Sequence, residues 1–347
     1  MWKTLSFLQK NLIWTIPFMM ILGLISGYFF EMGFIKIAVI PLTFLMVYPM
    51  MVNLQIEKVF SLEGMKVQAV TQFINFAVIP LIAFALGNYF FPESPMIVLG
   101  LLFAALLPTS GMTISWTGFA KGNMNAAIKM TVIGLIIGSL ATPLYAKWLM
   151  GETIDMPMGK IFTSIAVVVF LPMIFGYLTK VLIVKFNGNE KYQKDIKQKF
   201  PPISTLGVLG IVFVAMSLKS ASIISNPAIL LSYLFPIVIL YSINLIISTI
   251  VGKLFFNRGD AIALVYGTVM RNLSIALAIA MTAFKSRGSE IAIIIAISYI
   301  VQVQSAAWYV KFTDKIFGSV KEMPQIGRVQ PAGWYFKLTD KIFRKAS

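Results

Sequence analysis

The chain has 347 residues, of which 58% are hydrophobic and only 12% are charged, and its mean hydropathy is +0.85. These values exclude an ordinary soluble domain. The net charge of +16 alone could suggest a nucleic-acid partner, but the placement of the basic residues argues against that role.

Ten apolar stretches are long enough to cross a hydrocarbon core, which takes about 20 residues. They lie near residues 12–30, 34–52, 68–91, 96–120, 126–149, 161–186, 201–219, 228–255, 260–284 and 289–312. A bilayer offers no water to backbone polar groups, so these stretches are predicted to be helices. The first is too hydrophobic for a removable signal peptide and lacks its small-residue cleavage site. The predicted fold class is therefore an all-α membrane protein with ten transmembrane helices.

The basic residues lie mostly on one side of these spans. Lys and Arg number 21 in the two termini and the loops on their side, against 6 in the opposite loops. The positive-inside rule then places both termini in the cytoplasm, in a multi-pass protein of the cell's inner (plasma) membrane. The same loops suit the anionic head groups of the lipid bilayer. No nucleic-acid partner is expected, and the oligomeric state is left open.

Ten spans with both ends inside divide into two repeats of five, about 12–149 and 161–312, within a transporter domain of residues 1–318. A five-span unit starts and ends on opposite sides of the membrane, so the second copy must be inverted. The polar stretch 187–199 (NGNEKYQKDIKQK) is expected to be a mobile cytoplasmic loop.

The fourth span is interrupted near its middle by Pro108, which removes a helix hydrogen bond. Thr109, Ser110 and Gly111 follow, and Thr113 comes soon after. An unwound helix here would offer free backbone groups, hydroxyls and a half-helix N-terminus that favours an anion. The alternative is a proline kink whose backbone groups are satisfied by the Ser and Thr side chains.

The ninth span is interrupted by Arg271 and Asn272, with Ser274 close behind. Arg271 is the only charged residue near the middle of any span, and no acid lies at comparable depth. A buried arginine is costly in a bilayer, so it is expected either to bind an anionic substrate or to clamp crossed helices. Spans 4 and 9 are symmetry mates, and paired breaks of this kind indicate the binding site of a secondary transporter.

Gln72 and Asn75 in the third span are three residues apart and share a helix face. They could bind a cation or bond to a neighbouring span. Asn244, Gln302 and Gln304 are weaker candidates, and interhelical hydrogen bonds suit them better.

Several kinds of chemistry have no residues to perform them. The chain has no Cys and no His, and it lacks a nucleotide-binding motif. No metal site, cofactor or enzymatic activity is therefore expected. Arg does not release its proton, so sodium, held by neutral oxygens such as those of Gln72, Asn75 and Thr113, is the candidate coupling ion. Lys129, near the end of the fifth span, is expected to extend toward the membrane surface.

The C-terminal tail, residues 319–347, contains a repeat of the end of the tenth span. Residues 306–317 read AAWYVKFTDKIF and residues 332–343 read AGWYFKLTDKIF, identical at nine of twelve positions. Aromatic residues interleaved with Lys suit an amphipathic helix on the inner leaflet. The alternative is a duplication without a role.

Two runs resemble a known family. LLPTSGMTISWTGFAKGN (106–123) and VMRNLSIALAIAM (269–281) are similar to the fourth- and ninth-span signatures of arsenical-resistance permeases, which share a superfamily with the bile acid:sodium symporters. The resemblance covers roughly residues 5–315. It implies two inverted five-helix repeats, a panel and a core subdomain, and discontinuous helices 4 and 9 that cross at the substrate site.

The chain departs from this family's pattern at three points. Arsenite permeases carry a cysteine where this chain has Thr109, and a glutamate where it has Ser274. Thiolates bind arsenite better than hydroxyls do. Sodium-coupled relatives keep an acidic residue in the ninth span, which is absent here, although Gln72 stands at the position of their third-span glutamine.

The sequence thus predicts an alternating-access secondary transporter of a small organic or inorganic anion. Its expected contacts are Thr109, Ser110, Gly111, Arg271, Asn272 and Ser274. One alternative is an arsenite/antimonite efflux permease. A second, of another class, is a transport-inactive membrane sensor or scaffold.

Overall fold

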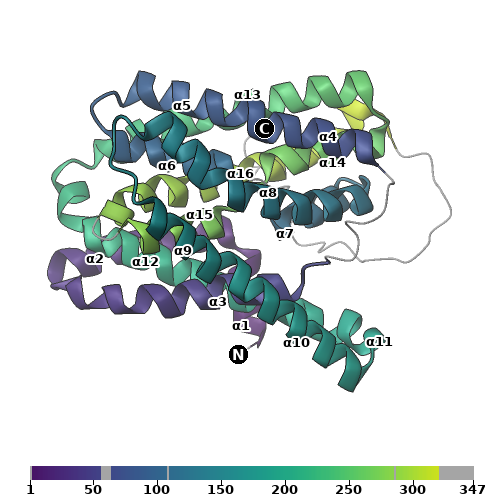
Figure 1. Ribbon diagram of the computed structural model, residues 1–347, viewed down its shortest axis with the longest axis horizontal. Coiled ribbons are helices and arrows are strands. Elements are labelled where there is room, and N and C mark those ends of the chain that lie inside the picture. The colour runs from purple at the N-terminus through teal and green to yellow at the C-terminus, as the bar shows by residue number, and fades with distance from the viewer. Residues whose placement is uncertain (1, 56–63, 108, 285–286, 320–347) are drawn as a thin grey trace, which may run out of the picture.

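The computed structural model describes residues 2–55, 64–107, 109–284 and 287–319, and every regular element within them is a helix (Figure 1). The first half contains α1 (Trp2–Lys10), α2 (Leu12–Phe29), η1 (Met32–Ala38), α3 (Val39–Val52), α4 (Met65–Phe73), η3 (Ile74–Val78), α5 (Ile79–Phe90), α6 (Pro95–Leu106), α7 (Gly111–Phe119) and α8 (Met124–Met150). The second half contains α9 (Met158–Ile165), η4 (Ala166–Phe170), α10 (Leu171–Asn187), α11 (Asn189–Lys191), η5 (Tyr192–Ile196), η6 (Lys197–Lys199), α12 (Phe200–Ser225), α13 (Ala228–Phe255), α14 (Arg258–Val269), α15 (Leu273–Ala283) and α16 (Gly288–Phe317).

Seven helices in the described part of the chain are long and apolar enough to cross a membrane. An eighth is added if the bent pair α1–α2 counts as one span. The predicted spans 96–120 and 260–284 are different, because each consists of two short helices, α6 with α7 and α14 with α15. The predicted helical breaks are thus present, whereas the count of ten spans stays a prediction.

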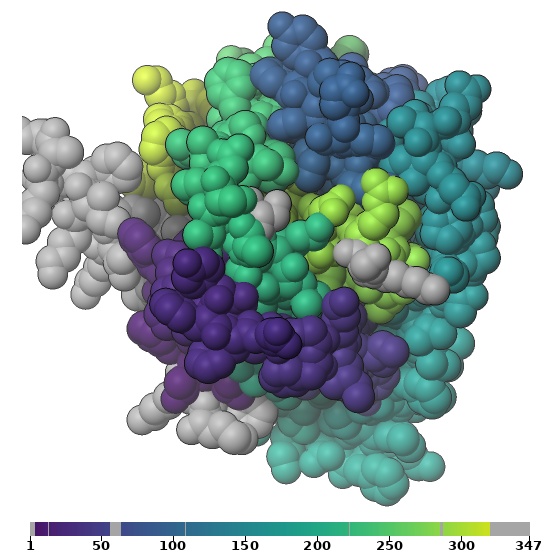
Figure 2. All heavy atoms as spheres, turned by 90° about the vertical axis from the view of Figure 1, so that its left-hand side faces the viewer, coloured from purple at the N-terminus to yellow at the C-terminus, as the bar shows by residue number. Residues whose placement is uncertain are grey.

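The helices form two groups. Helices α1, α2, α3, α10 and α12 pack together along the lower side of Figure 1, and α4, α5, α7, α8, α13 and α14 lie along the upper side. Helix α16 packs against members of both groups. Figure 2 views the molecule from the left of Figure 1, with the purple N-terminal helices below and the blue and green segments above.

Helices in the lower group approach closely because small residues lie at their contacts. A methyl group on Gly207 of α12 would lie 2.4 Å from the backbone nitrogen of Met46 in α3. One on Gly27 of α2 would lie 2.2 Å from the carbonyl oxygen of Ser217 in α12. Close backbone approach at small residues is how helices gain packing energy where no hydrophobic effect drives them together.

An ion pair joins the lower group to α16. Lys219 of α12 contacts Glu290 in the first turn of α16 at 2.5 Å, and both side chains are partly buried.

The polar stretch 187–199 is not the mobile loop that its composition suggested. It forms the end of α10 followed by α11, η5 and η6. The ring of Tyr192 is buried, and its hydroxyl donates to the carbonyl of Val52 at 2.9 Å. Asn53 donates in turn to the carbonyl of Lys197 at 2.9 Å. The expectation of a loop is wrong, since the segment is helical and these bonds join it to the end of α3, whereas its mobility stays a prediction.

Only the first copy of the tail repeat lies within the described residues. The first copy, 306–317, forms the last turns of α16. The second copy, 332–343, lies outside the described residues, so its predicted role stays a prediction.

Candidate functional site

The two helix breaks are in direct contact. Helix α6 ends at Leu106 and α7 begins at Gly111, while α14 ends at Val269 and α15 begins at Leu273. The backbone N–H of Asn272, in the second break, donates to the carbonyl of Leu107, in the first, at 2.6 Å. Pro108 lies outside the described residues. Segments more than 160 residues apart in sequence thus meet backbone to backbone in the interior.

In the first break, the hydroxyls bond to the protein itself. Thr109 is fully buried with φ +60°, which is uncommon for a β-branched residue, and its Oγ1 donates to the carbonyl of Met130 in α8 at 3.0 Å. Ser110 caps α7 by accepting from the N–H of Met112 at 3.2 Å. Its own N–H donates to Thr113 Oγ1 at 3.2 Å. These side chains stabilise the start of α7.

The N-terminus of α7 is open at Gly111. This residue is exposed, and a methyl group on it would meet no atom within 4 Å. The first backbone N–H groups of a helix lack intrahelical partners and favour negative charge. The first break therefore presents an uncovered helix N-terminus at Gly111.

In the second break, the polar residues cap α15 and bond to α16. Asn272 Oδ1 accepts from the N–H of Ile275 at 3.3 Å. The hydroxyl of Ser274 bonds to that of Tyr299. The backbone of Arg271 is held by Gln302, whose Oε1 accepts from Arg271 N–H at 2.8 Å and whose Nε2 donates to Arg271 O at 3.2 Å.

The guanidinium of Arg271 stands apart from this bonding. The residue is 2% exposed, and its Nη1 and Nη2 have no hydrogen-bond partner among the described residues. The buried charged residues in the described chain are Lys129 and Arg271, and none of the buried residues there is Asp or Glu. A buried charge without a counter-charge is strongly unfavourable, so the guanidinium has the environment of a group that binds an anion.

The last turn of α14 is closed by two asparagines from different helices. Asn75 donates to the carbonyl of Gly267 at 3.0 Å, and Asn244 of α13 donates to that of Thr268 at 2.9 Å. These carbonyls would otherwise lack partners at a helix C-terminus. Asn244 and Gln302 thus make interhelical hydrogen bonds, as their sequence positions suggested.

Most polar side-chain atoms in a row of carboxamides on α4 and η3 have no hydrogen-bond partner among the described residues. Both polar atoms of Gln72, both of Gln68 and Oδ1 of Asn75 are buried and unpaired. They make up five of the ten such atoms found in the described residues. The π-helical turn η3 begins directly after α4, and such turns are frequent at functional sites. Gln68 was not singled out from the sequence, although its spacing of four from Gln72 was the available signal.

Lys129 lies inside the protein. It is 3% exposed, so the expectation that it extends toward the membrane surface is wrong. It precedes Met130, whose carbonyl accepts from Thr109 and whose sulfur lies beside Gly267 of α14. This turn of α8 is therefore packed against both broken segments, and the apolar run around Lys129 could not reveal that.

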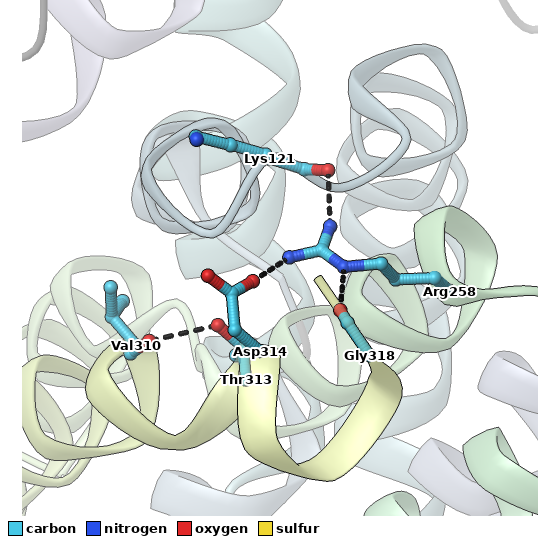
Figure 3. Close-up of polar contacts among 6 residues, drawn as sticks. All are labelled: Lys121, Arg258, Val310, Thr313, Asp314 and Gly318. Atoms are coloured by element: carbon cyan, nitrogen blue, oxygen red, sulfur yellow. Dashed lines mark hydrogen bonds and ion pairs between the residues drawn. The ribbon is translucent and has the colours of Figure 1, made fainter. Parts of the chain in front are cut away.

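The far ends of α7 and α14 are fixed by Arg258 (Figure 3). Its guanidinium pairs with Asp314 of α16, and it donates to the carbonyls of Lys121 at 2.9 Å and Gly318 at 2.6 Å. Asn123 adds a bond to Asp260 at 2.7 Å. Contact with Asp314 leaves Arg258 structural, in contrast to Arg271.

The described residues contain no group of three or more His, Cys, Asp or Glu that could hold a metal ion. The groups assembled around the two breaks are instead a cation, two helix N-termini and neutral amides.

Comparison with known proteins gives two findings. The model of the Sodium Bile acid symporter family matches residues 40–226, which include the first break. The chain is also similar to an arsenical-resistance protein Acr3 of Corynebacterium glutamicum, 23% identical over 308 residues, which are 82% of this chain and 83% of that protein.

Two further relatives match over shorter stretches. Acr3 of Alkaliphilus metalliredigens is 25% identical over 224 residues, 60% of this chain and 62% of that protein. An uncharacterized sodium-dependent transporter of Bacillus subtilis, YocS, is 26% identical over 211 residues, 59% of this chain and 62% of that protein.

Proposed function

The chain belongs to the Sodium Bile acid symporter family, and from this premise we propose that it is a secondary transporter of a small organic or inorganic anion that works by alternating access. The observation that carries the proposal is the buried guanidinium of Arg271, whose two Nη atoms have no partner among the described residues. An anion is the ligand that would offset the cost of burying it.

Two helix N-termini add to this charge preference. Helix α7 begins at the open Gly111 and α15 begins at Leu273, directly after Arg271. Half-helix N-termini that face a substrate's negative group are a recurrent arrangement in transporters with broken helices. Thr109, Ser110, Asn272 and Ser274 make bonds that help to hold the two breaks in place, and their contact with the substrate stays a prediction.

The proposed architecture is ten spans in two inverted repeats. Adding α2 and the two broken segments to the seven long helices gives ten, in the order expected from the sequence. In this arrangement both termini lie in the cytoplasm. The lower group of helices in Figure 1 would be the panel, and the upper group, together with α6, α15 and α16, would be the core that carries the breaks.

Sodium is the proposed coupling ion, bound by neutral oxygens. Gln72 Oε1 and Asn75 Oδ1 are buried and have no hydrogen-bond partner among the described residues. Asn75 also bonds to the C-terminal end of α14, and helix C-termini favour cations. Thr113 is a weaker ligand, because its Oγ1 already accepts from Ser110. A relative described as a sodium-dependent transporter agrees with this assignment.

Arsenite or antimonite efflux is the second candidate, because two relatives are described as arsenical-resistance proteins. Thr109 takes the position of the family's cysteine, and its hydroxyl is bonded to α8. Without a thiolate or a free hydroxyl at this position, capture of a soft thiophile is disfavoured.

The test is thermal stabilisation of the purified protein by sulfate, phosphate, acetate, arsenite and antimonite, each with and without sodium. Ligands that bind the folded state raise its stability by mass action. We expect stabilisation by an oxyanion, enhanced by sodium and lost in Arg271→Ala, which should still insert into the membrane. Flux of the same anion into proteoliposomes should be lost in parallel.

Two controls make the result specific. Arg271→Lys keeps the charge but lacks the paired N–H groups, so it should retain weaker binding. Thr109→Ser keeps the hydroxyl and should bind as the wild type does. Normal transport by Arg271→Ala would refute the anion site. Stabilisation by arsenite but by none of the other anions would favour the second candidate. Anion binding without flux into proteoliposomes would indicate a sensor.

A further inference from the structure

The backbone of Arg271 poses a problem that the fold has to solve. The residue lies after the last turn of α14 and before the first turn of α15, so neither helix provides partners for its N–H and C=O. Inside a membrane protein, an unsatisfied backbone polar group costs several kcal/mol. Something outside the broken helix must therefore bond to both groups.

That partner is one side chain, Gln302 of α16. Its carboxamide accepts from Arg271 N–H at 2.8 Å and donates to Arg271 O at 3.2 Å, and Gln302 itself is fully buried. We propose that Gln302 is the positioning residue of the anion site, because it holds Arg271 by the backbone alone and leaves the guanidinium available. This inference rests on the proposed transport of an anion.

A third bond ties this amide to α13. The hydroxyl of Tyr241 in α13 donates to Gln302 Oε1 at 3.0 Å, and Tyr241 is buried as well. The oxygen thus accepts from two donors and the nitrogen donates to a carbonyl, and the reverse orientation of the amide would break both bonds to Arg271. Helices α13 and α16 together set the plane of the Arg271 peptide.

Only glutamine combines the required length, donor and acceptor. A carboxylate at position 302 could accept but not donate, and its charge would pair with the guanidinium. An asparagine is one methylene shorter and cannot reach both groups from the same backbone position. A leucine of similar size leaves the N–H and C=O of Arg271 without partners.

The consequence for the substrate is geometric. Because the peptide plane is fixed and neither Nη atom has a hydrogen-bond partner among the described residues, the guanidinium presents two parallel donors. Such a fork matches two oxygens of one group, as in a carboxylate or a tetrahedral oxyanion. The site is therefore assigned to anions that can bind through two oxygens, in preference to halides.

The first experiment tests the clamp without any substrate. Hydrogen–deuterium exchange of peptides covering residues 269–276 is measured in the wild type, Gln302→Leu and Gln304→Leu. Gln304 is the matched control, being the same residue type two positions along the same helix but exposed. Loss of the acceptor for Arg271 N–H should accelerate exchange in Gln302→Leu only. Equal exchange in all three proteins would overturn the clamp.

The second experiment measures the consequence for binding. Potassium sulfate and potassium acetate are titrated in thermal-shift assays of the wild type, Gln302→Leu, Arg271→Ala and the double variant. Gln302→Leu should weaken binding about tenfold, the effect of losing one well-formed interaction. It should have no further effect in the Arg271→Ala background, because the amide acts only through Arg271. Tyr241→Phe should give a smaller loss.

The outcomes separate the positioning role from the proposed function. If Gln302→Leu melts earlier but binds both anions as the wild type does, Gln302 is merely structural and the inference is wrong. If neither anion stabilises the wild type, the proposed anion site is refuted, and the positioning role of Gln302 is refuted with it. Stabilisation by chloride equal to that by sulfate would refute the two-oxygen assignment.

Discussion

The two breaks differ in which part of a residue bonds to a neighbouring helix: a side chain in the first break and a backbone in the second. In the first break, the side chain of Thr109 bonds to the backbone of α8. In the second, the backbone of Arg271 bonds to a side chain of α16. The bond in the first break occupies the side chain of Thr109. The bonds in the second leave the Nη atoms of Arg271 without a hydrogen-bond partner among the described residues.

The largest effect should come from Thr109→Val, which removes the hydroxyl and keeps the shape. The carbonyl of Met130 would lose its added donor, and we expect a loss of stability of about 1–3 kcal/mol. Thermal unfolding should shift down by several degrees, while the folded protein binds sulfate as the wild type does. Thr109→Ser should restore the stability. If Thr109→Val unfolds at the wild-type temperature but no longer binds sulfate, Thr109 is a substrate ligand and the contrast between the two breaks is wrong.

A smaller effect is expected from Asn244→Leu, which removes one of the two donors at the end of α14. The Thr268 carbonyl would lose its bond, but Ser248 would keep its contact with the Thr268 hydroxyl. We expect a loss of about 1 kcal/mol, measured by thermal unfolding. Asn88→Leu is the control, since the exposed Asn88 donates to the carbonyl of Phe84 within its own helix, α5. If both variants unfold at the same temperature, the C-terminal end of α14 is not stabilised by the bond from α13.

The smallest effect should come from Gly111→Ala, which tests whether the first break also touches the substrate. A methyl group there meets no atom within 4 Å, so folding should be unchanged or stabilised by up to about 1 kcal/mol. If an anion approaches the open N-terminus of α7, the methyl group should weaken sulfate binding severalfold. Unchanged binding would confine the anion to the second break and sharpen the contrast between them.

The breaks themselves were predictable because their signals are local. A proline followed by Thr, Ser and Gly, and an arginine in an apolar run, each stand out within a few residues. The roles of the neighbouring residues were not local. Thr109 and Ser274 were predicted as substrate contacts, and the structure shows the bonds that each already makes, to α8 and to Tyr299. Whether they also touch the substrate stays a prediction.

The errors have the same origin. Lys129 was expected to reach the membrane surface, and the stretch 187–199 was expected to be a loop. Their composition supports both expectations, and both fail because of partners that are distant in sequence. Tyr192 bonds to Val52, 140 residues away, and the turn containing Met130 packs against Gly267.

The amino-acid sequence by itself determined that this is a helical membrane protein, where two of its helices break, and that one break carries a charge. Hydropathy and helix-breaking act on neighbouring residues, so they can be read along the chain. The tertiary structure was needed to show that Gln302 holds the backbone of Arg271, and that the two Nη atoms of Arg271 lack hydrogen-bond partners in the described part of the chain. A hydrogen bond depends on distance and direction in space, and helices packed side by side bring together groups that the sequence keeps far apart.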